Sequence, residues 1–343
     1  MSPAVETLDL TKTFVKKTLK GSIFKRMIRR VTTKPEHVTA VDHVNLQIGE
    51  GELFGLLGPN GAGKTSTIKL LCTLLVPDQG TAKVNGYDIV KEPNKVRESV
   101  GVVTGGERGL YWRLTARENL LFFARMYDMS DHVSKPKIDE LLKLVELDGR
   151  ADETVEKYSR GMKQRLHLIR GLIHDPAILL LDEPTLGLDP ASARVIRDFV
   201  KQRLQREQKK TILLTTHYMD EADQLCDRIA IIDNGKVIGL GTPAELKKSL
   251  SQADIIQINA SNVPEAAESL LKNIEGISEV ALSFDDSDAG RAQLRIHTMD
   301  AESVLPEITQ TLVSKGVKIH ALQEIEPTLE DVFIGLTGRK LRD

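Results

Sequence analysis

A glycine-rich segment constrains this 343-residue chain more than any other feature. It matches the pattern G-x-x-x-x-G-K-[ST], follows an apolar run at 53–57 and precedes a helix predicted over 64–75. Its residues are Gly58, Pro59, Asn60, Gly61, Ala62, Gly63, Lys64 and Thr65. Phosphate groups are bound by backbone N–H groups at close range, and glycines permit that approach. The segment therefore predicts a phosphate-binding loop rather than a chance glycine-rich turn.

The last residues of this segment carry its chemistry. We expect Lys64 to offer a positive charge to the outer phosphates of a nucleoside triphosphate. Thr65 offers a hydroxyl group to a Mg²⁺ ion that accompanies those phosphates. The predicted helix begins at the same point, and the dipole of its N-terminus favours anions. The loop and the helix are thus expected to form one anion-binding unit.

A second predicted strand ends in two carboxylates. The run 178–181 is apolar, and Asp182, Glu183 and Pro184 follow it directly. Two acids at the tip of a buried strand are costly unless something compensates them. A Mg²⁺ ion beside Asp182 does so, and Glu183 is then placed to orient or deprotonate an attacking water. The alternative is an acidic corner in solvent, which the phosphate-binding loop makes less favoured.

A histidine follows the next predicted strand. His217 comes after the apolar run at 211–215, one strand beyond the acid pair. A single histidine is more often a structural residue than a catalytic one. Its position also suits a contact with the terminal phosphate, and both interpretations stay open on the residues alone. The loop, the acid pair and the histidine together predict a Mg²⁺-dependent nucleoside triphosphatase.

Between these elements lies a run that resembles the signature motif of the ABC ATPases, L-S-G-G-Q followed by x-Q-R. It reads Tyr158-Ser159-Arg160-Gly161-Met162-Lys163-Gln164-Arg165. The order of glycine loop, signature, acid corner, an L-x-L-D loop at 186–189 and histidine is also similar to that family. The resemblance covers roughly residues 5–245. It implies an α/β P-loop NTPase core with an inserted helical subdomain.

The resemblance implies a role for each matching residue. The segment Gly58–Ser66 would bind ATP, and Thr65 and Asp182 would hold Mg²⁺. Glu183 would be the catalytic base, and His217 would contact the γ-phosphate. In this family two copies bind two ATP molecules between them, which implies a homodimer joined through its ATP sites.

The signature and the loop after residue 103 depart from the family pattern. Ser159 and Gly161 keep the positions that would touch the γ-phosphate of ATP held by the second copy, but Arg160 and Met162 replace Gly and Gln. The loop 104–108 lacks the Gln that helps coordinate Mg²⁺ in the family and links hydrolysis to the membrane subunit. The place of this Gln is taken by Glu107 or by a water, or it is left unfilled, and we do not assign it.

Within the family the chain resembles the ATPases of exporters of the daunorubicin-resistance type, through the signature, the run 110–115 and the tail 327–333. This implies an energising subunit whose partner is a separate integral membrane permease, docked at 105–130, with an unspecified cargo. One alternative is a soluble ABC ATPase acting on nucleic acid or ribosomes. A single glycine loop and the lack of a heptad run disfavour it. A second alternative is a module that binds ATP without hydrolysing it, and Glu183 and His217 argue against that alternative.

The hydrophobic pattern predicts two domains. Residues 1–248 form the ATP-binding domain, in which 15–38 read as an insertion and 105–175 as a mostly helical subdomain. From residue 249 the pattern restarts in the order βαββαβ, which predicts a small α+β, ferredoxin-like domain over 249–343. Asn-Gly pairs at 85–86 and 234–235 predict tight turns between strands.

The insertion is strongly basic. Residues 16–34 carry eight Lys or Arg and no acid, with apolar residues three and four apart, which predicts an amphipathic helix. We expect this helix either to pack on the ATPase core or to contact the membrane surface or the permease. Contact with nucleic acid is a minor alternative. Two cysteines, no signal-peptide core and no apolar run of about 20 residues predict a cytoplasmic protein that does not itself span the membrane. The resemblance to exporter ATPases implies a peripheral location at the inner face of the cell membrane.

Overall fold

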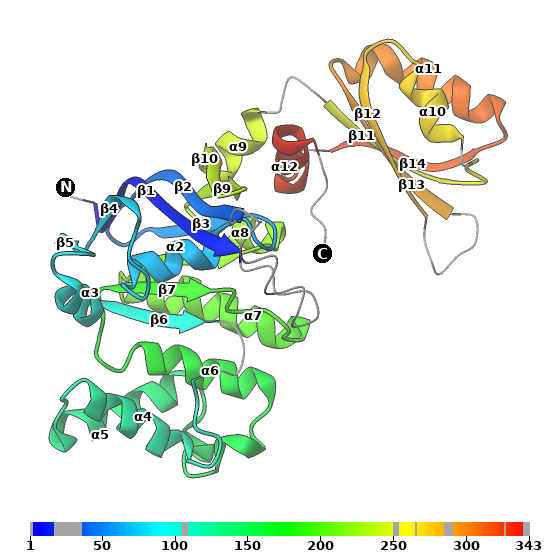
Figure 1. Cartoon of the computed structure of the whole chain (residues 1–343). Helices are drawn as coiled ribbons and strands as arrows, with labels where there is room; N and C mark the ends of the chain where they lie inside the picture. Colours follow the sequence, from blue (N-terminus) through cyan, green and yellow to red (C-terminus); the bar gives the residue numbers. More distant parts are fainter. Residues whose placement is uncertain are drawn as a thin grey trace, which may run out of the picture. The chain divides into compact units, whose positions relative to one another are not determined.

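The computed structural model describes residues 3–16, 36–104, 109–249, 254–264, 266–284, 291–325 and 327–338. The chain divides into two compact units, the first ending at Thr242 and the second beginning at Pro243. Each unit has its own sheets and its own apolar core (Figure 1). The division falls before helix α9 (Pro243–Ser249), whereas the sequence predicts a boundary after residue 248. Helix α9 belongs to the second unit because it packs against α12 (Leu329–Thr337).

A six-stranded sheet forms the centre of the first unit, in the order β10-β9-β3-β8-β7-β6. Strand β10 pairs antiparallel with β9, and the other neighbours pair in parallel. Every residue of β3, β8 and β7 is buried, as the apolar runs predict for parallel strands. The strands are β3 (Leu53–Leu57), β6 (Val100–Thr104), β7 (Ile178–Asp182), β8 (Thr211–Thr216), β9 (Arg228–Asp233) and β10 (Lys236–Gly241).

A four-stranded antiparallel sheet completes the core of this unit, in the order β2-β1-β4-β5. Its strands are β1 (Val5–Lys16), β2 (Glu36–Ile48), β4 (Gln79–Val84) and β5 (Tyr87–Asp88). Within the predicted insertion 15–38, Val15 pairs with His37 and Lys16 with Glu36, so strands β1 and β2 extend into both of its ends. Apart from Lys16, the predicted amphipathic helix of 16–34 lies outside the described residues.

Helices pack on these sheets. They are α2 (Lys64–Leu71), α3 (Pro93–Ser99), α7 (Pro190–Asp198), the π-helix η3 (Phe199–Glu207) and α8 (Met219–Leu225). Helix α2 packs against β7, β2 and β4. It ends before the predicted residue 75, because Thr73 adopts a left-handed backbone with φ of 62°, which a helix cannot continue through. Helix η3 follows α7 without a break.

The helical subdomain lies between β6 and β7, as the sequence predicts. It contains α4 (Ala116–Met126), α5 (Asp131–Leu144) and α6 (Arg160–Gly171), with short 3₁₀ turns η1 (Asp148–Arg150) and η2 (Val155–Lys157). Helix α4 begins with a capping box in which the Thr115 hydroxyl accepts from the backbone of Glu118 and the Glu118 carboxylate accepts from that of Thr115. Helix α6 packs against β6, which ties the subdomain to the central sheet.

The second unit has the predicted βαββαβ order. Its four strands form an antiparallel sheet in the order β12-β13-β11-β14, which is the arrangement expected of a ferredoxin-like domain. Helix α10 spans Ala267–Lys272 and is therefore shorter than the predicted 263–273. The elements are β11 (Asp254–Ser261), α10 (Ala267–Lys272), β12 (Ile277–Phe284), β13 (Arg291–Thr298), α11 (Ala301–Ser314) and β14 (Lys318–Ile325).

Among the described residues, no helix combines the length and the apolar character needed to cross a bilayer. Both cysteines are buried, and burial raises the pKa of the Cys226 thiol. Cys226 packs below Gly55 of β3, where a Cβ atom would approach its sulfur to 2.7 Å. The cysteines therefore serve as packing residues of the core.

The contact between β6 and α6 yields a stability prediction. A Cβ atom on Gly101 would lie 2.2 Å from the carbonyl oxygen of Gly171 and 2.8 Å from side-chain atoms of Leu179. We expect Gly101→Ala to destabilise the protein by about 1–3 kcal/mol, because overpacking displaces the helix. The thermal unfolding midpoint measures this. The matched control is Gly149→Ala, where no atom lies within 4 Å; equal midpoints for the two variants would contradict the close contact.

Candidate active site

The glycine loop between β3 and α2 packs tightly against its neighbours. A Cβ atom on Gly63, where φ is 112°, would lie 2.2 Å from the carbonyl oxygen of Ala40 in β2. A Cβ atom on Gly58 would lie equally close to the carbonyl oxygen of Ile232 in β9. Any side chain at either position would therefore displace backbone, and only glycine fits. Close packing against β2 and β9 therefore fixes the conformation of the loop, and α2 begins directly after it.

Lys64 is the first residue of α2, and its side chain turns back over the loop. Its Nζ donates to the carbonyl oxygens of Gly58 at 2.6 Å and Pro59 at 3.2 Å. It also lies 3.4 Å from Oε1 of Glu183, and the side chain is only 4% exposed. Burial lowers the pKa of Lys64, and the nearby Glu183 carboxylate opposes that shift. The ammonium group thus joins the glycine loop to the acid pair.

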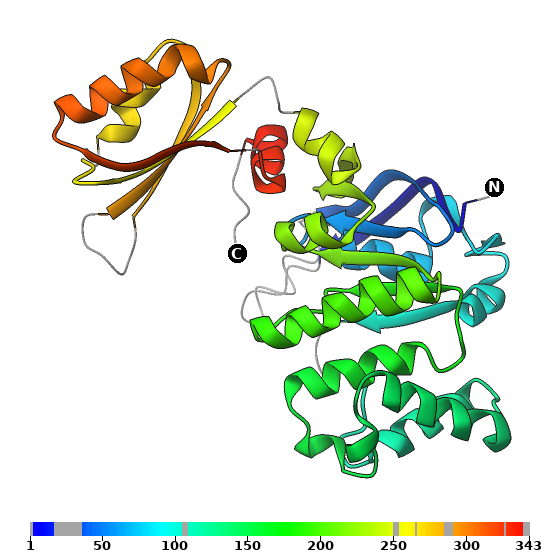
Figure 2. The same ribbon diagram turned by 180° about the vertical axis from the view of Figure 1, so that it is seen from behind.

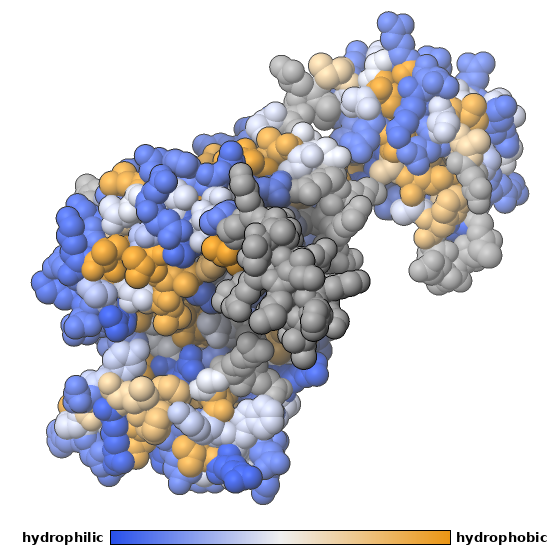
Figure 3. Space-filling view, viewed as in Figure 1, coloured by the Kyte–Doolittle hydropathy of each residue, from blue (hydrophilic) through white to orange (hydrophobic). Residues whose placement is uncertain are grey.

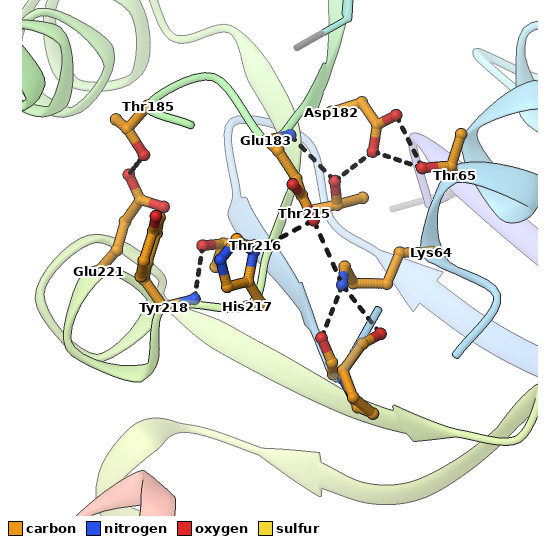
Figure 4. A network of polar contacts seen from close by, with 12 residues as sticks. Lys64, Thr65, Asp182, Glu183, Thr185, Thr215, Thr216, His217, Tyr218 and Glu221 are labelled. Carbon is orange, nitrogen blue, oxygen red and sulfur yellow. Dashed lines mark hydrogen bonds and ion pairs between the residues drawn. The ribbon is translucent and has the colours of Figure 1, made fainter. Parts of the chain in front are cut away.

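Asp182 lies at the last position of β7, next to Thr65 of α2. The Thr65 hydroxyl donates to Oδ1 and Oδ2 of Asp182 at 3.1 and 2.9 Å. The Thr215 hydroxyl of β8 donates to Oδ1 as well (Figure 4). Hydroxyl and carboxylate oxygens are the ligands that Mg²⁺ prefers. The pair of Thr65 and Asp182 therefore has the chemistry of a magnesium site beside the phosphate-binding loop.

Glu183 has an unusual backbone for a residue other than glycine. Its φ is 52°, in the left-handed region, and its N–H donates to the carbonyl oxygen of Thr215 at 3.0 Å. Its carboxylate oxygen Oε1 lies 3.3 Å from Nδ1 of His217 and 3.4 Å from Nζ of Lys64 (Figure 4). Strain of this kind is found at functional sites, where the surrounding structure maintains it. The turn aims the carboxylate at the lysine and the histidine.

His217 is held by the turn that follows β8. The backbone N–H of Tyr218 donates to the Thr216 hydroxyl at 3.0 Å, and the Tyr218 ring packs on the imidazole with centroids 4.1 Å apart. Behind the turn, the Thr185 hydroxyl donates to the buried Glu221 carboxylate at 2.8 Å. These contacts fix the loops after β7 and β8 to one another. The histidine therefore stays beside the acid pair, as its place one strand later suggests.

Ser159 and Gly161 lie at the start of α6, in the helical subdomain. Ser159 is the exposed N-cap, and its hydroxyl accepts from the backbone N–H of Met162. Gly161 is buried, and a Cβ atom there would lie 2.7 Å from the Ser192 hydroxyl of α7. In the described part of the chain, no hydrogen bond or ion pair joins these two residues to the glycine loop or the acid pair. A single chain therefore does not bring the two halves of the predicted site together.

The other predicted residues differ in exposure. Asn60 and Gly61 are exposed at the tip of the loop, Ala62 is buried beneath it, and Ser66 is half-buried in the first turn of α2. Most of the altered loop, including Glu107, lies outside the described residues, so the replacement of the missing Gln stays open.

Sequence reasoning missed Thr215. This residue is fully buried, donates to Asp182, and its backbone and hydroxyl oxygens both accept from the N–H of Glu183. The parallel register places it opposite Asp182 on the neighbouring strand. The available signal was a hydroxyl residue near the end of a buried strand, one strand away from the acids. That signal becomes specific only when the strand order is known.

His167 of α6 is a second buried histidine that sequence reasoning did not single out. It is 1% exposed, and neither ring nitrogen has a hydrogen-bond partner among the described residues. Burial, with a smaller effect of the Arg170 charge, lowers the pKa of His167 to about 3. The folded protein therefore keeps this imidazole neutral, whereas the unfolded chain takes up a proton near pH 6.5.

Two family models match the chain. One, described as "ABC transporter", matches residues 41–186. The other, described as "ATP-binding protein DrrA1-3-like, C-terminal domain", matches residues 241–337. The first covers the loop, the signature and the acid pair, and the second covers most of the second unit.

Curated proteins and solved structures resemble the chain over much of its length. The linearmycin resistance ATP-binding protein LnrL of Bacillus subtilis is 38% identical over 89% of this chain and 96% of its own length. The Nod factor export ATP-binding protein I of Paraburkholderia xenovorans is 37% identical over 89% of this chain and 94% of its own. The dimeric ATP-binding cassette MJ0796 bound to ADP and Pi matches with a TM-score of 0.59 at 28% identity, over 69% of this chain and 98% of its own.

The depressed pKa of His167 yields a prediction for acid stability. The neutral imidazole contributes fully to the free energy of unfolding above pH 6.5. This contribution is lost as the pH falls from 6.5 toward 3, because over that range the unfolded chain binds a proton at this histidine and the folded protein does not. The loss amounts to at most about 1.4 kcal/mol per pH unit. We expect His167→Gln to show a smaller drop in thermal unfolding midpoint between pH 7 and pH 5 than the wild type. The exposed His132→Gln is the control, and identical drops in all three proteins would exclude the effect.

Proposed function

This chain belongs to the ABC transporter family of ATP-binding proteins, and we propose that it is the ATP-hydrolysing subunit of an exporter. It works as a homodimer with a separate membrane permease, at the inner face of the cell membrane. The names of its relatives, which refer to linearmycin resistance and to Nod factor export, support the export direction. Its own cargo is not specified by any of these observations.

The proposal depends most on the cluster in which Lys64, Glu183 and His217 meet above the glycine loop. When ATP binds, Lys64 exchanges loop carbonyl oxygens for the outer phosphates. Glu183 orients a water and takes its proton as the water oxygen attacks the γ-phosphorus, while the bond from that phosphorus to the β–γ bridging oxygen breaks and ADP leaves. His217 contacts the γ-phosphate and holds the carboxylate in place.

Thr65 and Asp182 are the residues that hold Mg²⁺ in this proposal. Their oxygens already lie within 3.1 Å of one another, and both are hard ligands suited to this ion. The described residues contain no cluster of three His, Cys, Asp or Glu side chains that could hold a metal alone. A Mg²⁺ ion held by these two residues, with phosphate oxygens and water as its other ligands, would fit that composition and would supply positive charge beside the phosphates.

A second copy supplies the other half of each site. Ser159 is exposed at the N-terminus of the twelve-residue helix α6, where its hydroxyl and the free backbone N–H groups can receive a phosphate. Because no hydrogen bond or ion pair among the described residues joins Ser159 to the glycine loop, we assign Ser159 to the ATP that the partner holds. Two ATP molecules thus lie between two chains, each gripped by the loop of one and the signature of the other.

The helical subdomain presents an apolar surface for the permease. Hydrophobic side chains gather over α4 and α5 in Figure 3, and Met126 and Val133 are 66% and 56% exposed. Beside them lies a hollow of about 670 Å³, lined among others by Tyr127, Val133 and His174. Exposed apolar clusters of this kind mark interaction sites. This surface overlaps the predicted docking region 105–130 and extends it into α5.

Nucleic acid is not proposed as a partner. The soluble alternative rests on relatives with paired cassettes or long coiled coils, and this chain has neither one in its sequence. Its named relatives given above are resistance and export proteins instead.

The catalytic role of Glu183 is tested by Glu183→Gln. We expect this variant to keep ATP binding and to lose at least a hundredfold in hydrolysis rate, because the amide cannot accept the proton. With ATP and Mg²⁺ it should form a dimer in analytical ultracentrifugation, and adding Ser159→Arg should abolish that dimer. Unchanged hydrolysis would refute the role of the carboxylate. A dimer that survives Ser159→Arg would refute the shared site.

The docking surface is tested by Val133→Asp together with Met126→Asp. We expect co-purification with the co-expressed permease to fall at least tenfold, because two carboxylates would be buried in an apolar contact. ATP hydrolysis by the isolated subunit should stay within twofold of wild type, since both residues lie outside the catalytic cluster. Leu240→Asp, at a leucine on β10 that is 45% exposed, is the control. Undiminished co-purification of the double variant would rule this surface out.

A further inference from the structure

A basic hollow lies on the surface of the first unit, away from the residues of the catalytic cluster. It has a volume of about 500 Å³ and lies between the continuous helix of α7 and η3 and the end of α8. Figure 2 shows these helices next to each other, α7 and η3 in green and α8 in yellow-green. The residues that line it are Arg194, Arg197, Asp198, Lys201, Gln202, Arg206, Gln224 and Leu225.

The π-helical winding of η3 creates this arrangement. On an α-helix, with about 3.6 residues per turn, Arg197 and Arg206 would lie on opposite sides, because nine residues make two and a half turns. Between them the chain is π-helical over Phe199–Glu207, and i→i+5 bonds widen each turn. Arg197 and Arg206 therefore face the same hollow. π-Helical turns are rare in proteins and occur frequently at functional sites, which makes this segment a candidate for one.

The charges of the hollow are not balanced by the protein. Lys201 is neutralised by Asp227, 2.9 Å away, and also donates to the carbonyl oxygen of Leu225. Arg206 donates to the neutral amide oxygen of Gln202. Arg194 and Arg197 form no hydrogen bond or ion pair within the described part of the chain.

Only one carboxylate, Asp198, belongs to the lining, against the three arginines. Like charges held around one concavity repel each other and attract anions, and the low-dielectric walls concentrate that field. By contrast, Arg203 on the same helix is paired with Glu207 at 2.8 Å. The helix therefore pairs Arg203 with an acidic residue, whereas the arginines of the hollow remain available to a ligand.

We propose that this hollow binds a small soluble molecule carrying two or more phosphate groups, as a site separate from the glycine loop. Guanidinium groups match phosphate oxygens with paired hydrogen bonds, which makes arginine the preferred residue for such recognition. The volume lies within the range of small-ligand sites, about 300–1,000 Å³. The amides of Gln202 and Gln224 can bind an uncharged part of the same molecule.

Inorganic pyrophosphate is the probe for this site. The full-length protein is first saturated with ADP, which occupies the glycine loop, and pyrophosphate is then titrated by isothermal calorimetry at 50 mM and 200 mM salt. We expect one further site per chain that weakens with salt, as a phosphate contact does. The double variant Arg194→Gln with Arg197→Gln should bind at least tenfold more weakly. Arg203→Gln, the matched control on the same helix, should bind like wild type.

Four results would overturn the proposal. The first is no binding beyond the ADP site, and the second is an equal loss in the Arg203→Gln control, which indicates non-specific attraction. The third is binding of a pentaglutamate peptide as tightly as pyrophosphate, which assigns the hollow to acidic protein segments. The fourth is sedimentation with phosphatidylglycerol vesicles that depends on Arg194 and Arg197 while pyrophosphate fails to bind, which assigns it to lipid headgroups.

Discussion

The buried ammonium group of Lys64 is the interaction on which the site depends. It donates to two carbonyl oxygens of the glycine loop and lies 3.4 Å from the Glu183 carboxylate. A charge removed from water needs partners, and these groups supply them before any phosphate arrives. The same lysine therefore connects the segment after β3 with the end of β7, more than one hundred residues later in the chain. The glycine loop and the Glu183 carboxylate thus lie together around one buried cation.

Parallel strand pairing brings the remaining groups to that point. Strands β3, β8 and β7 are neighbours, so their carboxyl ends lie at one edge of the sheet. The register puts Thr215 opposite Asp182, and its hydroxyl and carbonyl oxygens hold both acids in position. The helical subdomain carries Ser159 on a different surface. In the proposed dimer this division would make hydrolysis depend on a second chain, so that ATP binding could drive movement in a permease.

The sequence alone determined the chemistry of this protein and most of its elements. A glycine loop, two acids after an apolar run and a signature run can be recognised locally, because each depends on neighbouring residues and spacing. The same holds for the buried strands and for the βαββαβ order of the second unit, whose periods of apolar residues the structure reproduces. Helix ends were less predictable. The left-handed backbone of Thr73 decides where α2 ends, and α10 begins at Ala267 rather than at the predicted residue 263.

Only the tertiary structure decided what lies beside what. The role of Thr215 follows from strand order and register, which a local pattern does not contain. The burial of His167, which has no hydrogen-bond partner among the described residues, depends on packing from several elements. The basic hollow depends on the wide winding of η3, because an α-helical period would have placed Arg197 and Arg206 on opposite faces. Local sequence fixes backbone preference and residue chemistry, whereas proximity between distant residues arises from packing. That is why the catalytic residues could be named from the chain and their supporting contacts could not.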